Sequence, residues 1–290
     1  ADADADADAN RDATAAAVPW ADELPYLTLG PLKEKVGMFQ EVVVFHRQSG
    51  TLLVTDLLVS VPSTPPAVVA ANDKRALLFH ARDSFLDEVA DTPAARAEGW
   101  KKIALFSLFF QCSALDVASP PDGSLSGALS FFRSAFPRGV PPSSRALGWA
   151  GFWPFDWQPQ WRAAFSRLRS GGRPVVPPIL QVSVLNREPE KVLAFADAVA
   201  EAFPLTKLVP CHFDAPVAAT TREWSAAFDF LRGDTADSVL VRARRWLTRS
   251  AATLPDEDLA FLRDFDDNLV QAGAIRPPAP KVSADSKSTN

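Results

Sequence analysis

Two short strings place a metal-binding type of side chain just beyond an apolar run. Asp56 follows Leu52-Leu53-Val54-Thr55, and His212 follows Val209-Pro210-Cys211. A loop after a strand exposes such side chains, and carboxylate and imidazole groups bind zinc and other divalent metals. An aspartate at a strand end is also a common turn or cap residue, and a lone histidine is often structural. Both interpretations stay open for each position.

A hydrolytic zinc centre needs about three protein ligands and one open position for water. Asp56 and His212 supply two. The other histidines are His46, which precedes a predicted turn, and His80, whose element the pattern does not define. We therefore expect a non-catalytic relic without a cofactor. The alternative is a metal-dependent hydrolase in which His46, His80 or a partner chain completes the site.

The sequence lacks the motifs of other common catalytic and cofactor-binding sites, and its charge and hydropathy argue against two classes of partner. No G-x-S-x-G, G-x-x-x-x-G-K, G-x-G-x-x-G or C-x-x-C string is present. Cys211 adjoins His212, but neighbours on an extended strand point to opposite faces, so we expect no thiol–imidazole pair. A net charge of −5 argues against nucleic acid as a partner. No apolar run approaches the roughly 20 residues that span a bilayer, so we expect a soluble chain.

Residues 149–161 hold four tryptophans and two phenylalanines. Such density is typical of a satellite core under a loop, of a protein interface, or of contact with lipid or with a pigment such as chlorophyll or carotenoid. Peripheral membrane contact therefore stays open. The candidate aromatic surface consists of Trp149, Phe152, Trp153, Phe155, Trp157 and Trp161.

The first elements that position these residues are a hairpin and a long helix. Residues 41–46 and 51–61 are β-branched and apolar and flank a turn-like Arg-Gln-Ser-Gly, which predicts a β-hairpin. The spacing of aromatic and aliphatic residues predicts a helix over 93–112.

The later part of the chain predicts a strand–helix–strand unit. Residues 179–185 read as a buried strand, 186–189 as a helix start, and 207–209 as a second, parallel strand. Thr220 and Glu223 then form a capping box, with Gly233 as the helix stop.

Two helices and two tails complete the expected organisation. A basic and an acidic helix should pack as a hairpin over 234–276, because opposite charges attract. The Ala/Asp-rich residues 1–18 should be a disordered acidic tail, and residues 277–290 should be loosely held.

Taken in order, these strings resemble a known family. The stretch EVVVFHRQSGTLLVTD at 41–56 is similar to the plastid and cyanobacterial family known as domain of unknown function 4336. The likeness extends through residues 19–23, 99–100, 178–180 and VPCHFDAP at 209–216, and it spans roughly 19–231.

This resemblance implies an α/β fold of the diverged metallo-β-lactamase type, an αββα sandwich. We expect a partial sandwich, its C-terminal half, over 19–233, with an aromatic-rich helical insert at about 93–170 and extra C-terminal helices. By resemblance Asp56 falls at the bridging aspartate of that fold and His212 at its last metal-binding histidine. The H-x-H-x-D-H string of active members is absent, which puts hydrolase activity in doubt.

Half of such a sandwich leaves one sheet face uncovered, so the aromatic segment or another polypeptide must cover it. The family's plastid setting implies a chloroplast location, in the stroma or at the thylakoid. We therefore predict a non-catalytic plastid binding or assembly protein, an accessory subunit of a photosynthetic or other thylakoid-associated complex. The alternatives are the hydrolase, with Asp56, His212 and His46 as ligands, and a carrier of a pigment or small molecule.

Overall fold

The computed structural model describes residues 19–118, 125–135, 139–148, 152–233 and 254–283. It is a mixed α/β structure whose main sheet has the strand order β1-β2-β3-β6-β7, with a two-stranded sheet of β4 and β5 beside it. The strands are β1 (Tyr26–Glu34), β2 (Gly37–His46), β3 (Thr51–Val54), β4 (Leu115–Val117), β5 (Phe155–Trp157), β6 (Lys207–Pro210) and β7 (Val217–Ala218).

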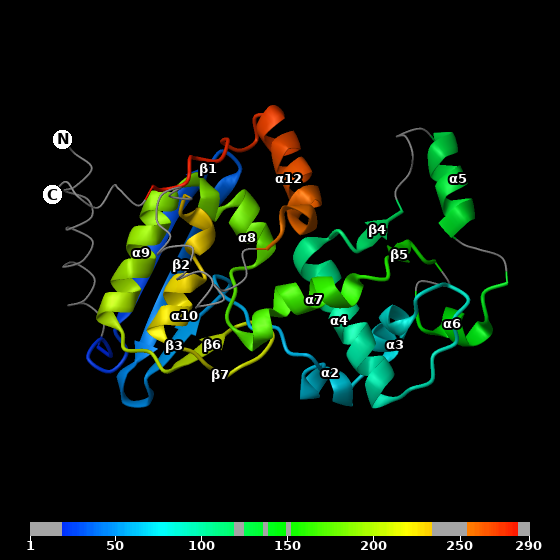
Figure 1. Cartoon of the computed structure of the whole chain (residues 1–290), viewed down its shortest axis with the longest axis horizontal. Helices are drawn as coiled ribbons and strands as arrows, with labels where there is room; N and C mark the ends of the chain where they lie inside the picture. Colours follow the sequence, from blue (N-terminus) through cyan, green and yellow to red (C-terminus); the bar gives the residue numbers. More distant parts are fainter. Residues whose placement is uncertain (1–18, 119–124, 136–138, 149–151, 234–253, 284–290) are drawn as a thin grey trace, which may run out of the picture.

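Helices cover one face of the main sheet, and further helices form a separate lobe beside the sheet (Figure 1). The helices are α2 (Ala67–Ala71), α3 (Arg75–Ala81), α4 (Pro93–Phe109), α5 (Leu125–Ala135), α6 (Pro142–Ala146), α7 (Trp161–Arg169), α8 (Pro178–Ser183), α9 (Pro189–Ala202), α10 (Thr221–Ala226) and α12 (Asp256–Gln271). None of the helices in the described ranges is long and apolar enough to cross a membrane.

The predicted hairpin is confirmed as β2 and β3, which pair antiparallel with Val44 opposite Leu53. Gly50 closes the turn at φ 62°, and a Cβ there would lie 2.7 Å from Oγ1 of Thr206. The second strand ends at Val54 rather than at residue 61. It ends because the buried carboxylate of Glu41 accepts the next backbone N–H, that of Thr55, at 2.8 Å.

Strand β1 was missed by the sequence reasoning. It pairs antiparallel with β2, and its register shifts between Leu29 and Leu32 at the Gly30-Pro31 pair. A glycine and a proline inside the run break the alternation by which a strand is recognised. The strand nevertheless forms, because Leu29 and Leu32 are buried in the core under the sheet.

The prediction of a strand at 179–185 is wrong, because Pro178–Ser183 form helix α8. Pro178 is the first residue of α8, and a 3-10 turn over Leu185–Arg187 follows that helix. A short buried apolar run does not distinguish strand from helix, and a proline at the first helical position favours the helix. The helix after Asn186 and the strand at 207–209 are confirmed as α9 and β6. The parallel partner of β6 is β3.

One face of the main sheet carries the first hydrophobic core. Helices α8, α9 and α10 lie over this face (Figure 1), which we call the inner face. Phe45 of β2 stacks on Phe203, just after α9, with ring centroids 5.0 Å apart. Trp224 of α10 is buried and donates a hydrogen bond from its indole nitrogen to the carbonyl of Ala196 at 2.9 Å.

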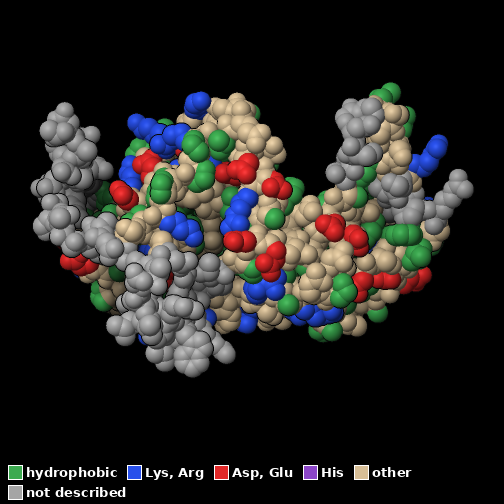
Figure 2. Space-filling view, turned by 45° about the horizontal axis from the view of Figure 1, so that its top comes forward, with side chains coloured by type: hydrophobic (Ala, Val, Ile, Leu, Met, Phe, Trp, Pro, Cys, Tyr) green, Lys and Arg blue, Asp and Glu red, His purple; other side chains and the backbone are tan. Residues whose placement is uncertain are grey.

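A second core lies in the helical lobe. It joins α4, α7, α12 and the β4–β5 pair, so the insert expected at about 93–170 has a core of its own. Helix α4 is confirmed and ends at Phe109, three residues before the predicted end. Helix α5 stands apart from this lobe (Figure 1), and its Leu125 and Leu129 are exposed. Figure 2 shows acidic and basic side chains interspersed on the visible face of the molecule.

The chain after the sheet differs from expectation at the end of α10 and over residues 277–283. The Thr220–Glu223 capping box is confirmed, but α10 ends at Ala226, so Gly233 is not its stop. Residues 1–18 and the basic half of the predicted hairpin, at 234–253, lie outside the described residues, while the acidic half is confirmed as α12. Of the tail expected at 277–290, residues 284–290 lie outside the described residues. Residues 277–283 are held: the N–H of Val282 donates to the carbonyl of Leu231, and the carbonyl of Val282 accepts a hydrogen bond from the N–H of Gly233.

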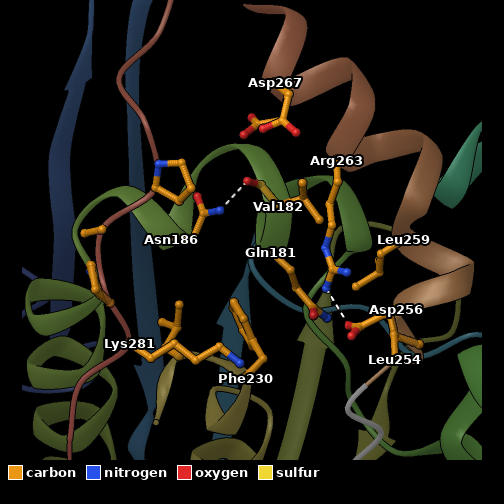
Figure 3. Close-up of a pocket in the computed structure, with 15 residues that line it drawn as sticks. Gln181, Val182, Asn186, Phe230, Leu254, Asp256, Leu259, Arg263, Asp267 and Lys281 are labelled. Atoms are coloured by element: carbon orange, nitrogen blue, oxygen red, sulfur yellow. Dashed lines mark hydrogen bonds and ion pairs between the residues drawn. The ribbon is translucent and has the colours of Figure 1, made fainter. Parts of the chain in front are cut away.

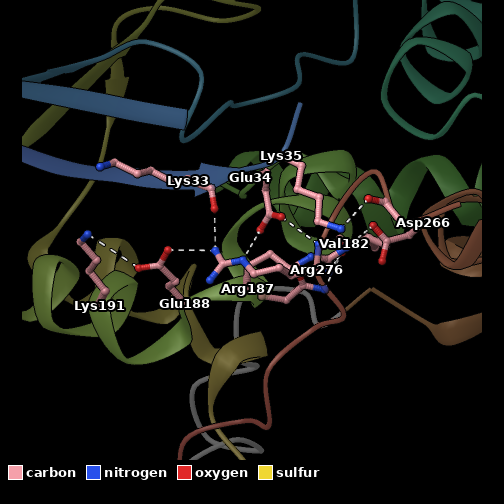
Figure 4. Close-up of polar contacts among 11 residues, drawn as sticks. Lys33, Glu34, Lys35, Val182, Arg187, Glu188, Lys191, Asp266 and Arg276 are labelled. Atoms are coloured by element: carbon pink, nitrogen blue, oxygen red, sulfur yellow. Dashed lines mark hydrogen bonds and ion pairs between the residues drawn. The ribbon is translucent and has the colours of Figure 1, made fainter. Parts of the chain in front are cut away.

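Ion pairs fasten this C-terminal part to the sheet side of the molecule (Figure 4). Arg187, after α8, pairs with Asp266 of α12 at 2.6 Å, and both side chains are buried. Arg276 contacts Glu34 of β1 at 3.0 Å and Glu188 at 3.1 Å. Helix α12 is therefore part of the folded body.

Candidate functional site

The structure brings Asp56 and His212 together. Strands β3 and β6 are parallel neighbours, so their carboxyl ends meet at the same edge of the sheet. Oδ1 of Asp56 lies 2.9 Å from Nε2 of His212, and the two side chains are 59% and 62% exposed. An exposed pair of this kind contributes little to stability, so its side chains are open to other ligands.

The loop that carries Asp56 is held by Glu41. The two carboxylate oxygens of Glu41 accept hydrogen bonds from Thr55 N at 2.8 Å, Thr55 Oγ1 at 2.6 Å and Asp56 N at 3.3 Å. The side chain of Glu41 is buried on β2, and the sequence reasoning missed its role. A charged residue in an otherwise apolar strand was the signal that could have revealed it.

The other two histidines lie away from this pair. His46 is opposite Thr51, at the far end of β3, with its Nδ1 2.7 Å from Ser49 Oγ and its Nε2 3.5 Å from Glu23. His80 belongs to α3 in the helical lobe. Burial, with the charges of Lys102 and Arg82, lowers the pKa of His80 to about 4.

The residues of this edge do not fit a hydrolytic metal centre. Within the part of the chain that the structure describes, no group of three or more His, Cys, Asp or Glu side chains is placed to hold an ion. The backbone N–H of Cys211 contacts the carbonyl of Thr55 at 3.4 Å, so this residue is near, but its side chain joins no such group. Asp56 and His212 remain two ligands where about three are needed.

The aromatic segment is largely internal. Trp153, Phe155, Trp157 and Trp161 are buried in the second core, so the core alternative describes these four side chains. Phe152 is half-buried against Phe131, at 5.8 Å between ring centroids, and Trp149 lies outside the described residues.

Two cations stack on these rings, a feature the sequence reasoning did not find. The guanidinium of Arg82 lies 4.6 Å from the ring centroid of Trp153, and the ammonium of Lys102 lies 5.0 Å from that of Trp161. Both cations are buried, and burial lowers the pKa of Lys102. Cations of the helical lobe itself therefore cover the ring faces of Trp153 and Trp161.

The second face of the main sheet carries an apolar row. The register places Tyr26 opposite Val44, Val44 opposite Leu53, and Leu53 opposite Val209, so these four side chains lie side by side across four strands. Alternation along β2 adds two further members. We call the apolar members of this side the outer face: Tyr26, Met38, Val42, Val44, Leu53 and Val209. The same register and alternation also place polar side chains on this side, namely Thr28, Gln40, Thr51, His46 and Lys207.

The outer face is open among the described residues. Leu53 is 39% exposed, Val42 41% and Met38 69%. Their neighbours Val43 and Leu52 point the other way and are buried under the helices. The row from Tyr26 to Val209 is apolar, whereas Gln40 separates Met38 from Val42 and Thr28 lies opposite Val42. Exposed apolar side chains on a sheet are one feature of a binding surface.

A pocket of about 300 Å³ lies between α8, α12 and the C-terminal segment (Figure 3). Phe230, Leu254 and Leu259 give it an apolar lining, while Lys281 and Arg263 bring positive charge. Arg263 is paired with Asp256 at 2.6 Å, and two more carboxylates stand at the rim, so the lining favours no single charge.

Comparison with known proteins assigns the chain to a family without a described activity. A family model described as a domain of unknown function, DUF4336, matches residues 6–230. No curated protein and no solved structure matches the chain. The match covers the main sheet, the helical lobe and the Asp56–His212 pair, and α12 lies beyond its end.

Proposed function

We propose that this chain, which belongs to the family of the domain of unknown function DUF4336, works by binding another polypeptide and not by catalysis. The observation that carries the proposal is the outer face. Its row from Tyr26 to Val209 crosses four strands, and the helices that cover the sheet lie on the opposite side (Figure 1).

The burial of exposed apolar side chains would favour the binding of a partner to this face. Covering apolar surface contributes roughly 25 cal/mol per Å², and a flat aliphatic sheet face packs well against another layer of secondary structure. The buried tryptophans of the helical lobe pack in the second core and, among the described residues, do not pack on the outer face. The placement of His46 and His80 away from Asp56 and His212 supports the non-catalytic part of the proposal.

We extend the proposal to the finer fold and setting that the sequence resemblance implies. In this proposal, the main sheet and the helices on its one side would form one half of an αββα sandwich of the metallo-β-lactamase type. The chain would act in the chloroplast as an accessory subunit of a thylakoid-associated complex. Its distribution between stroma and thylakoid fractions, followed with an antibody, tests the location separately from the binding function.

Affinity isolation from the native source tests the binding function. The wild-type chain should bring down a polypeptide in near-stoichiometric amount, and Val42→Lys should lose it, because a charge in the outer face costs desolvation on binding. Val68→Lys is the matched control, since Val68 is 68% exposed on α2, away from the sheet. A polypeptide that both variants retain equally would contradict the proposal.

A metal-dependent hydrolase is the second candidate, favoured by the 2.9 Å contact between Asp56 and His212. It requires a further ligand from outside the described residues or from a partner. Elemental analysis after mild purification should then find near-stoichiometric zinc, iron or manganese that His212→Ala removes. Metal-free wild-type protein, purified without chelator, would count against this candidate.

A further inference from the structure

We propose that the pocket between α8, α12 and the C-terminal segment binds a short apolar peptide whose two termini are free (Figure 3). Helix α8 lies over the inner face of the sheet, so this site is on the side opposite the outer face (Figure 1). The inference therefore goes beyond the proposed function. The volume of about 300 Å³ is at the lower end of the roughly 300–1,000 Å³ of ligand pockets, which suits a dipeptide.

The walls of the pocket are largely apolar. Leu254 and Leu259 line it with side chains that are otherwise buried, and Phe230 adds an aromatic ring. Pro278 and Ala279 of the C-terminal segment also belong to the lining. Such walls can take up the aliphatic side chains of a ligand, because covering apolar surface is favourable.

Two carboxylates of the lining already have a cation partner. Arg263 contacts Asp256 at 2.6 Å, and Asp266 contacts a buried arginine of the 3-10 turn after α8 at 2.6 Å. The pKa of Asp256 is lowered mainly by Arg263 and to a smaller extent by Lys281. The partner of the Asp256 carboxylate is therefore Arg263.

The other charged residues of the lining are Lys281 and Asp267. They lie at opposite ends of the pocket, and the side chain of Lys281 extends into it beside Phe230 (Figure 3). One end thus offers a positive charge to a ligand and the other end a negative charge. A ligand that uses both ends carries a carboxylate at one terminus and an ammonium group at the other.

A buried amide between these ends provides a third polar contact. Gln181 is 7% exposed and lines the pocket from α8. Its amide nitrogen donates to the carbonyl of Val176 at 2.8 Å, which leaves its amide oxygen to accept a hydrogen bond from a ligand. The N–H of a peptide bond is such a donor. This contact favours a peptide over a zwitterion without an amide group.

The three contacts define one orientation of the ligand. Its ammonium group lies at Asp267, its peptide N–H at Gln181 and its carboxylate at Lys281. Lys281 and Asp267 are both exposed, so each charge contact contributes only modestly to affinity.

NMR titration of the full chain with leucyl-leucine tests the inference. The dipeptide should bind saturably. Leucyl-leucinamide, which lacks the carboxylate, and N-acetyl-leucyl-leucine, which lacks the ammonium group, should each bind about fivefold more weakly. Absence of saturable binding by leucyl-leucine, or equal affinity for the three compounds, overturns the inference.

Substitution of the two exposed charged residues tests the orientation. Lys281→Gln should weaken leucyl-leucine about fivefold and leave leucyl-leucinamide unchanged, because that compound has no carboxylate to lose a partner. Asp267→Asn should likewise weaken leucyl-leucine and leave N-acetyl-leucyl-leucine unchanged. Asp264→Asn, on the same helix but outside the lining, is the control and should change no affinity. Equal weakening of all three compounds by either lining variant, with the circular dichroism spectrum unchanged, would contradict this placement of the termini.

Discussion

At the scale of single residues, Glu41 explains how the edge of the sheet is built. Its buried carboxylate accepts hydrogen bonds from two backbone N–H groups and one hydroxyl. These bonds end β3 and aim the loop that carries Asp56 toward His212. The pair is thus positioned by a residue fifteen positions earlier in the chain.

Glu41→Gln should lower the free energy of unfolding by about 1–3 kcal/mol. An amide offers one acceptor oxygen where the carboxylate offers two, and its NH₂ group would face the backbone N–H groups of Thr55 and Asp56. Urea denaturation measures the change. Glu23→Gln, at an exposed carboxylate near His46, is the control and should change the midpoint little. Equal stability of the two variants would contradict this role for Glu41.

His80 should make the fold acid-sensitive. Its pKa is near 4 in the folded chain because the ring is buried, whereas the unfolded chain binds the proton with a pKa near 6.5. The unfolded state therefore gains protons first as the pH falls, and stability is lost between about pH 6.5 and 4.

His80→Phe should remove about 1.5 kcal/mol of the stability loss between pH 6.5 and 5. The ring lies among Phe79, Phe106 and Phe155, so phenylalanine preserves the packing. Chemical denaturation at the two pH values gives the difference directly. Identical losses for wild type and variant would show that His80 is not the residue that titrates.

At the scale of elements, α12 joins the two lobes although it lies beyond the family match. Asp258 is buried and pairs with Arg167 of α7 at 2.8 Å, while Asp266 pairs with Arg187 after α8. One helix thus neutralises a cation of each lobe. Leu259 and Leu262 add apolar contacts in the second core.

Asp266→Asn should lower the free energy of unfolding by about 3 kcal/mol, because it leaves the guanidinium of Arg187 buried without its counter-ion. Asp264→Asn, on an exposed position of the same helix, controls for the loss of a negative charge. Thermal unfolding of both variants provides the comparison. A similar small effect from the two substitutions would mean that α12 is only loosely docked.

The sequence predicted those elements whose signals are local. The capping box at Thr220 and Glu223 and the hairpin around Gly50 involve residues within a few positions of one another. Strand β1 and helix α8 depend on tertiary burial, which an isolated stretch of sequence does not reveal. The sequence placed Asp56 and His212 each just after a strand. Their contact depends on the parallel pairing of β3 with β6, which the sequence did not predict.

At the scale of the whole molecule, apolar side chains of the described residues form two buried cores, while Leu53, Val42 and Met38 of the outer face are exposed. The aromatic segment, for which a satellite core, an interface and contact with lipid or pigment stayed open, is mostly buried in the core of the helical lobe, where Lys102 and Arg82 stack on its rings. The inner face of the sheet is covered by helices (Figure 1). The outer face around Leu53 is where we propose that a partner packs.

The oxidation rate of Met38 tests this account most directly. Met38 is the single methionine of the sequence and is 69% exposed on the outer face. Peroxide treatment followed by mass spectrometry measures its conversion to the sulfoxide. We predict slow oxidation in the native assembly and fast oxidation in Leu53→Lys. Equally fast oxidation in both would contradict a partner on the outer face.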